Sequence, residues 1–220
     1  MKKFLTLALI LILFLVSSFS LGTSPSYAYS QSDLDRLLET RECPECDLSD
    51  ADLSDADLSR DDLRRANLRG AKLKDADLSD ADLSDADLRR AKLRHANLRG
   101  AKLKDADLSS AYLSGADLTG ANLSGADLRD AKLKNADLSG AFLTSADLMR
   151  ADLTGANLTC AVGADFIVAE IVAERWKEKE RQLLVPSGSK ARNSSRAIFF
   201  EKEREKLLGK DCKNAIEEEE

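Results

Sequence analysis

The four cysteines of this 220-residue chain, Cys43, Cys46, Cys160 and Cys212, are the first residues to consider for chemistry. Cys43-Pro44-Glu45-Cys46 has the spacing of a redox motif, but nothing around it indicates the βαβ unit in which such a motif works. A zinc site would need two further ligands at a suitable spacing, and His95 is the only histidine. We therefore predict that the cysteines are structural, with no metal and no cofactor.

Acid–base chemistry has no better candidate. His95 has Lys92 and Arg94 alongside it and no carboxylate placed to orient it, so we predict a surface residue. The sequence also contains no glycine-rich phosphate loop. No catalytic, cofactor-binding or metal-binding residue is predicted, and we expect the protein not to be an enzyme.

A five-residue repeat accounts for the middle of the chain. Leucine recurs at every fifth position from Leu48 to Leu158, twenty-three times in all. The residue two positions before each leucine is Ala, except at Cys46 and Asp61, so the unit reads Ala-Asp/Asn-Leu-x-x. A short fixed period indicates a repeat architecture.

The period of five excludes an ordinary helix or strand. On an α-helix the leucines would spiral around the surface, and on one straight strand they would alternate between its two faces. If the chain turns one corner per unit, Ala and Leu both point inward every time. The pattern therefore predicts an all-β solenoid whose interior is filled by leucine and alanine, which leaves no space for an active-site pocket.

Residues 46–160 resemble the pentapeptide-repeat family throughout. The resemblance implies a right-handed quadrilateral β-helix with four units, or twenty residues, in each coil. Twenty-three units then make about 5.75 coils, which form a rod roughly 27 Å long at a strand spacing of about 4.8 Å. Members of the family share a fold without sharing an activity.

Other columns of the repeat agree with this fold. Every glycine within residues 46–160 stands two residues after a leucine, where a corner needs backbone freedom. Every acidic residue there is Asp, whose short carboxylate can accept hydrogen bonds from nearby turn N–H groups. We therefore predict that the Asp before each leucine is structural rather than catalytic.

The first 28 residues read as a secretory signal peptide. Lysines precede an apolar run, Phe4–Val16, and the small residues Ser26 and Ala28 form a cleavage site. The run is too short for a comfortable membrane span. We expect cleavage after Ala28 and export of a soluble protein to the periplasm, the thylakoid lumen or the extracellular space; retention as an anchor is the alternative.

Export favours disulfides, which persist in oxidising compartments. Four cysteines allow three complete pairings. The pairing we favour joins Cys43 to Cys46, which would staple the first coil to its lead-in. It also joins Cys160 to Cys212, which would tie the tail to the last coil.

Both flanks are predicted to cap the solenoid, because an uncovered terminal coil exposes its core and its ladder. Residues 29–45 contain a short helix opened by Ser32-x-x-Asp35, with Leu34, Leu37 and Leu38 on its apolar side. The Cys-x-x-Cys lead-in after it is similar to that of exported pentapeptide proteins common in cyanobacteria. Residues 161–185 are predicted to form a C-terminal capping helix, and residues 186–220 a charged linker, a helix and an acidic tail.

Four units per coil place every fourth unit on the same side of the rod. One side then collects a candidate contact stripe: Lys72, Lys74, Lys92, Arg94, Tyr112, Lys132 and Lys134. The alternative is a solvated charge pattern without function. Ala-Lys-Leu-Lys recurs every thirty residues, at 71–74, 101–104 and 131–134, and so lands on opposite sides, as duplication without regard to face would produce.

Two binding functions follow. The first is a structural or protein-interaction scaffold for an unknown protein partner. Such a scaffold could also form a homodimer with a second copy of itself through an uncapped or flat face. The second is an acidic DNA mimic that inhibits a DNA-handling enzyme such as gyrase, suggested by resemblance to the quinolone-resistance pentapeptide proteins.

Charge density favours the scaffold. Residues 46–160 hold 21 Asp against 17 Lys and Arg, a net charge of −4. Along roughly 27 Å this is about one charge per 7 Å, whereas DNA carries one per about 1.7 Å. The acidic balance and the lack of a basic stretch interleaved with aromatic residues also argue against nucleic-acid binding.

Overall fold

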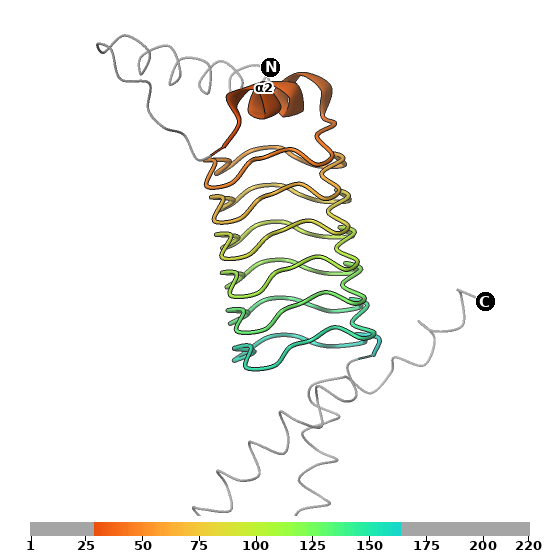
Figure 1. Cartoon of the computed structure of the whole chain (residues 1–220). Coiled ribbons are helices and arrows are strands. Elements are labelled where there is room, and N and C mark those ends of the chain that lie inside the picture. The colour runs from red at the N-terminus through yellow and green to blue at the C-terminus, as the bar shows by residue number, and fades with distance from the viewer. Residues whose placement is uncertain (1–28, 164–220) are drawn as a thin grey trace, which may run out of the picture.

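A computed structural model describes residues 29–163 of the chain, and a coil of twenty residues recurs through most of them. Isolated parallel β-bridges run from Glu42–Asp62 to Phe142–Val162, each between residues exactly twenty apart, and one follows every five residues. Each coil therefore has four sides, stacked in register into the column in Figure 1. The right-handed quadrilateral β-helix is confirmed.

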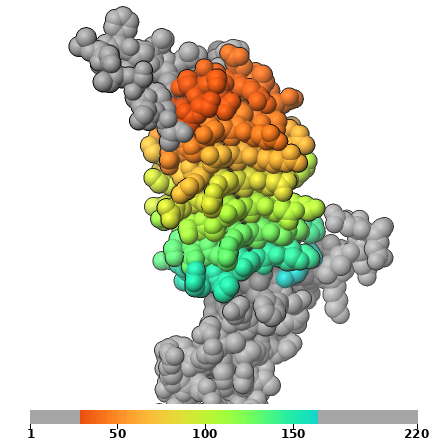
Figure 2. All heavy atoms as spheres, viewed as in Figure 1, coloured from red at the N-terminus to blue at the C-terminus, as the bar shows by residue number. Residues whose placement is uncertain are grey.

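The core of the column is made of the predicted leucine and alanine columns. From Leu48 to Leu143 every leucine of the repeat is at most 4% exposed, and the alanines between them are buried. Leu103 and its neighbours twenty residues away, Leu83 and Leu123, are fully buried. On the face seen in Figure 2 the coils form continuous bands of touching atoms.

Each corner is a turn of four residues. In the first leucine unit the N–H of Ala51 donates to the carbonyl of Leu48 at 3.1 Å, and the second central residue, Asp50, has φ of 57°. A positive φ at this position only is the pattern of a type II turn. All twenty-three residues of this column have positive φ, so the predicted place of the glycines is explained.

Where Asp or Asn precedes the leucine, as in seventeen of the twenty-three units, it supports the turn that follows. Its side-chain oxygen accepts a hydrogen bond from the N–H two residues later, as from Ser79 to Asp77 at 3.0 Å and from Thr119 to Asp117 at 2.9 Å. These carboxylates hold the corners, as predicted.

One helix, α2 (Gln31–Thr40), covers the N-terminal end of the column in the described part of the chain. It begins two residues earlier than the predicted Ser32-x-x-Asp35 cap: the N-cap is Ser30, whose hydroxyl accepts from the N–H of Asp33 at 3.3 Å. Leu34 and Leu37 pack into the core as predicted. The helix is fixed to the first coil by the N–H of Ser30, which donates to the carbonyl of Asp47 at 2.9 Å.

The Cys-x-x-Cys segment is itself a corner of the β-helix. Cys43 takes the place of a leucine and Cys46 the place of an alanine, and both are buried. The N–H of Cys46 donates to the carbonyl of Cys43 at 3.3 Å, and Glu45 has φ of 62°, as in later corners. A disulfide joins the two cysteines. The coil geometry therefore starts at Arg41, five residues before the recognisable repeat.

At the other end the described part closes with Val162, which pairs with Phe142. Inward residues in the middle of the last coil, such as Leu148 and Leu153, are only partly buried, whereas Leu158 is buried. Cys160 is disulfide-bonded, but its predicted partner Cys212 lies outside the described residues.

The signal peptide at residues 1–28 and the tail at residues 186–220 also lie outside the described residues, as does the predicted C-terminal capping helix of residues 161–185 from residue 164 onward. Within residues 29–163, no helix is long and apolar enough to cross a membrane.

Candidate functional site

The structure brings all seven residues of the predicted contact stripe to one side of the column. Lys72 pairs with Lys92, Lys92 with Tyr112, and Tyr112 with Lys132, each through a β-bridge. Lys74, Arg94 and Lys134 follow two residues later in the same coils. We call the outward residues of 72–75, 92–95, 112–115 and 132–135 the basic face. Tyr112, near its centre, is 47% exposed.

This side differs from the other three in charge. Within residues 46–160, the side that contains the basic face carries six basic and four acidic outward residues. The side that begins with Leu48 carries five basic and seven acidic residues. The side of Leu58 carries two basic and five acidic residues, and the side of Leu63 carries four of each. Of the four sides, one is therefore net positive, and Asp75 is the single acid within the basic face.

Elsewhere on the column most cations have an acidic partner. Arg64 pairs with Asp62 at 2.6 Å, and Arg89 with Asp87 at 2.5 Å. The side-chain hydrogen bonds from these arginines lower the pKa of both carboxyls, so the pairs remain charged well below neutral pH.

The basic face is less completely paired. Lys72 lies 3.0 Å from Asp52 and Lys74 lies 2.8 Å from Asp75. Among the described residues, no carboxylate lies within ion-pair distance of the other four cations of this face, Lys92, Arg94, Lys132 and Lys134. Their charge is available to a partner.

Asp61 is a buried acid whose role the sequence did not indicate. It stands in the inward alanine column, 2% exposed, and accepts a hydrogen bond from Nε of Arg41 at 2.6 Å. Arg41 lies twenty residues earlier, one coil above, and also donates to the carbonyl of Ser59 at 2.7 Å. Burial raises the pKa of Asp61 to about 6, against the opposing effect of Arg41. The available signal was the single acid in the alanine column.

His95 is exposed at an outward corner, as predicted. Its ring lies over Gly115 of the next coil, where a β-carbon would come within 2.5 Å of Nδ1. Among the described residues, no three His, Cys, Asp or Glu side chains are grouped so that they could hold a metal ion.

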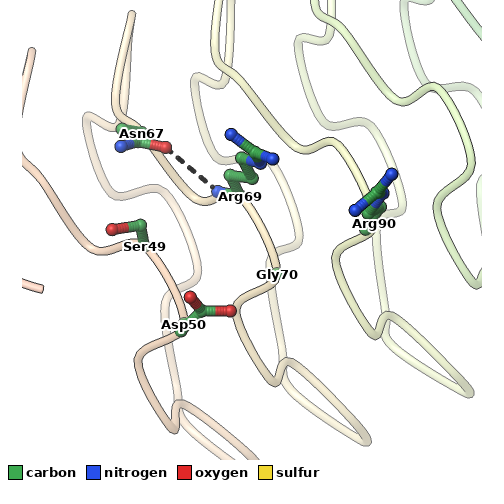
Figure 3. Close-up of a pocket in the computed structure, with 6 residues that line it drawn as sticks. All are labelled: Ser49, Asp50, Asn67, Arg69, Gly70 and Arg90. Atoms are coloured by element: carbon green, nitrogen blue, oxygen red, sulfur yellow. Dashed lines mark hydrogen bonds between the residues drawn. The ribbon is translucent and has the colours of Figure 1, made fainter. Parts of the chain in front are cut away.

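A shallow depression of about 300 Å³ lies on the side of Leu48 (Figure 3). Gly70 is part of its lining, and the carboxylate of Asp50 lies where a β-carbon of Gly70 would stand, since that atom would come within 2.1 Å of Oδ1. Asn67 accepts a hydrogen bond from the N–H of Arg69 at 3.2 Å, so this amide supports the turn. The lining contains one carboxylate and two guanidinium groups, without a nucleophile paired to a base.

Stacked four-sided coils with leucine at every fifth residue define a β-solenoid built from five-residue units. The sequence pattern of pentapeptide repeats matches residues 46–85, 86–125 and 126–166, and the chain belongs to this family. The family consists of non-catalytic repeat scaffolds. A comparison with curated proteins found no match.

Several solved structures are similar to parts of the chain. The pentapeptide repeat protein alr5209 from Nostoc PCC 7120 is 49% identical over 36% of this chain and 66% of its own length, with a TM-score of 0.36. HetL, a pentapeptide repeat protein involved in heterocyst differentiation regulation in the same cyanobacterium, is 31% identical over 53% of this chain and 74% of its own, with a TM-score of 0.29. AT2G44920, a pentapeptide repeat protein from the Arabidopsis thaliana thylakoid lumen, is 29% identical over 69% of this chain and 83% of its own length, with a TM-score of 0.35.

Proposed function

We propose that the protein is a non-enzymatic, exported scaffold that binds a protein partner on its basic face. The observation that carries this proposal is the charge of that face, net positive on a column whose other sides are neutral or acidic. A regular array of outward side chains is suited to recognition when, as here, four of its cations have no ion pair with any residue that the structure describes. The interior, filled by leucine and alanine, offers no cavity for a substrate.

Inhibition of a DNA-handling enzyme by mimicry is the weaker candidate. The most acidic side, that of Leu58, has two basic and five acidic outward residues. Over roughly 27 Å this is about one net charge per 9 Å, against one per about 1.7 Å in DNA. No observation on the structure favours this function.

Export is proposed from the basic, apolar and small-residue segments of residues 1–28. The mature N-terminus should then be Tyr29, and intact-mass measurement of the exported protein should show the loss of residues 1–28. Soluble cytoplasmic protein that retains Met1 would contradict export and would reopen the mimicry function.

Binding of a partner is tested by site-specific photo-crosslinking in intact cells. The crosslinking residue replaces Ser114, which lies between the cationic rows of the basic face, or, as a control, Ser124, which holds the same position of its unit on the side of Leu63. The proposal expects a discrete protein adduct from position 114 and none from position 124. Absence of an adduct at both positions, or equal adducts at both, would contradict a partner on this face.

A further inference from the structure

We propose that the partner presents a short, extended acidic segment to the basic face, with Lys92 and Arg94 as its principal contacts. This inference rests on the scaffold function proposed above. It follows from the spacing of the cations, the size of the face and the lack of ion pairs at its centre within residues 29–163.

The basic face consists of four rows, one from each of four consecutive coils. Three rows carry two cations each: Lys72 with Lys74, Lys92 with Arg94, and Lys132 with Lys134. The remaining row presents Tyr112 and Ser114. With rows about 4.8 Å apart, the cations cover about 14 Å along the column.

The size of this area indicates the kind of partner. A face about 14 Å long and three outward residues wide is far smaller than the roughly 800 Å² per partner that a standard protein interface buries. It corresponds to about five residues of extended chain at about 3.3 Å each. A short segment therefore fits the face better than a folded domain does.

The spacing of the rows matches an extended acidic segment in particular. Side chains on one face of a strand are about 6.6 Å apart, so carboxylates at alternating positions i, i+2 and i+4 span about 13 Å. Long lysine and arginine side chains can bridge the small difference from the rows of the face. Tyr112 lies between two cationic rows and is 47% exposed, so its ring can contact the aliphatic parts of the side chains of the segment.

Lys92 and Arg94 are the expected centre because a carboxylate can bind them without displacing an ion-pair partner from the part of the chain that the structure describes. Lys72 and Lys74 are already paired with Asp52 and Asp75. The segment Ala101-Lys102-Leu103-Lys104 on the side of Leu63 provides a matched contrast. It presents two cations at the same positions of its unit, with Lys104 in place of an arginine. Lys102 pairs with Asp82, Lys104 lies 4.0 Å from Asp105, and no basic row lies next to it.

The experiment measures binding of a fluorescent hexapeptide, Glu-Thr-Glu-Thr-Glu-Thr, to the mature full-length protein by anisotropy. We expect binding that weakens as salt is added and that disappears when Gln replaces Glu in the peptide. Lys92→Gln with Arg94→Gln should weaken binding about fivefold, whereas Lys102→Gln with Lys104→Gln, an equal change in net charge, should change it less than about twofold. Circular dichroism confirms that both variants remain folded.

Three results would overturn the inference. Equal loss in the two double variants would show a response to net charge alone. If the peptide does not bind at low salt while the crosslink at position 114 persists, the scaffold function stands but its partner is not an extended acidic segment. If Lys92→Gln with Arg94→Gln abolishes binding to vesicles of anionic phosphatidylglycerol and leaves the peptide unaffected, the face binds a lipid surface instead.

Discussion

Asp61 stands where every other unit of the repeat from residue 46 to residue 160 has Ala or Cys, and its environment accounts for its chemistry. A buried carboxylate is costly when charged unless a partner compensates it. Arg41 provides that partner at 2.6 Å, from the residue that ends α2 with φ of 61°. The pair therefore joins the residue that ends α2 to the coil that begins at Asp61, twenty residues later. Compensation is incomplete, because the pKa of Asp61 is still raised to about 6.

Asp61 should make the protein less stable as the pH rises. The folded pKa of about 6 lies above the value of about 3.9 expected for an unfolded chain, so between these values the folded state binds more protons. Relative to Asp61→Asn, which cannot ionise, the wild type should lose about 2 kcal/mol of unfolding free energy from pH 4 to pH 7. Denaturant unfolding of both proteins at several pH values measures the difference.

The neighbouring acid Asp62 serves as a control with the opposite sign. The hydrogen bond from Arg64 lowers its pKa, so its contribution is present above the unfolded value and is lost as the pH falls through the folded value. Asp62→Asn should therefore be less stable than the wild type at pH 7 and match it in strong acid. Parallel profiles for wild type and Asp61→Asn would mean that Asp61 is not desolvated in the folded protein.

The contrast between Leu103 and Asp61 shows which residues the sequence could predict. The inward leucines and alanines follow from the period of five alone, because side chains two apart in a strand share a face. The pair of Arg41 and Asp61 depends on a contact twenty residues apart, and Arg41 precedes the recognisable repeat. The contact stripe was predicted because its residues all lie within the repeat, where the coil length was known.

At the scale of the element, the corner is the unit that the fold repeats. Its second central residue has positive φ in all twenty-three units, yet only seven of them contain glycine. For other residues the left-handed conformation costs about 1–2 kcal/mol, less for Asn and Asp. The stacked coils therefore hold many corners in a conformation that their own residues disfavour.

Two adjacent arginines test this account of the corner. Arg90 has φ of 58° and no ion pair among the described residues, whereas Arg89 lies outside the positive-φ column and pairs with Asp87. Arg90→Gly should raise the unfolding free energy by about 0.5 kcal/mol, because relief of the left-handed strain exceeds the entropy cost of glycine. Arg89→Gly should lower it by about 1 kcal/mol.

Both variants change the net charge by the same amount, but Arg89→Gly also removes the ion pair with Asp87, so the test of the backbone is the sign of the change at position 90. Chemical denaturation under identical conditions gives the two differences. A loss of similar size in both variants would indicate that the corner conformation carries no strain at position 90.

The elements outside the repeat were predicted less accurately, for a physical reason. Two Ser-x-x-Asp patterns overlap at the start of α2, and the sequence does not distinguish Ser30 from Ser32 as the cap. The choice depends on the first coil, because the N–H of Ser30 bonds to Asp47. Cys43 likewise occupies a leucine position that only the stacking beneath it reveals, since Arg41-Glu42-Cys43 does not resemble Ala-Asp-Leu.

At the scale of the whole molecule, each coil is stabilised mainly by the coils next to it. The N–H of Leu103 donates to the carbonyl of Asn122 in the next coil at 2.7 Å, and the N–H of Lys102 donates to the carbonyl of Ala81 in the preceding coil at 2.9 Å. Such stacking determines the fold from very few residue types. It leaves the outward positions free to vary, so the partner is not encoded in the repeat that determines the architecture.

A pair of variants in the middle of the column tests this architecture directly. Leu103 is fully buried, so Leu103→Ala should lower the unfolding free energy by about 2–5 kcal/mol through the cavity it leaves. Lys102, one residue earlier, points outward and forms an exposed pair with Asp82, so Lys102→Ala should change stability by no more than about 0.5 kcal/mol. Thermal unfolding followed by circular dichroism compares the two.

Leu103→Lys extends the test from one residue to the column. A charge at this position has no partner in a core of leucine and alanine, and the coils on both sides share that core. The variant should lose structure across several coils and aggregate through the exposed ladder, rather than melt as a slightly weakened rod. If Leu103→Ala and Lys102→Ala melt at the same temperature, the leucine column does not form the core, and stacking at an interval of twenty residues is wrong for this protein.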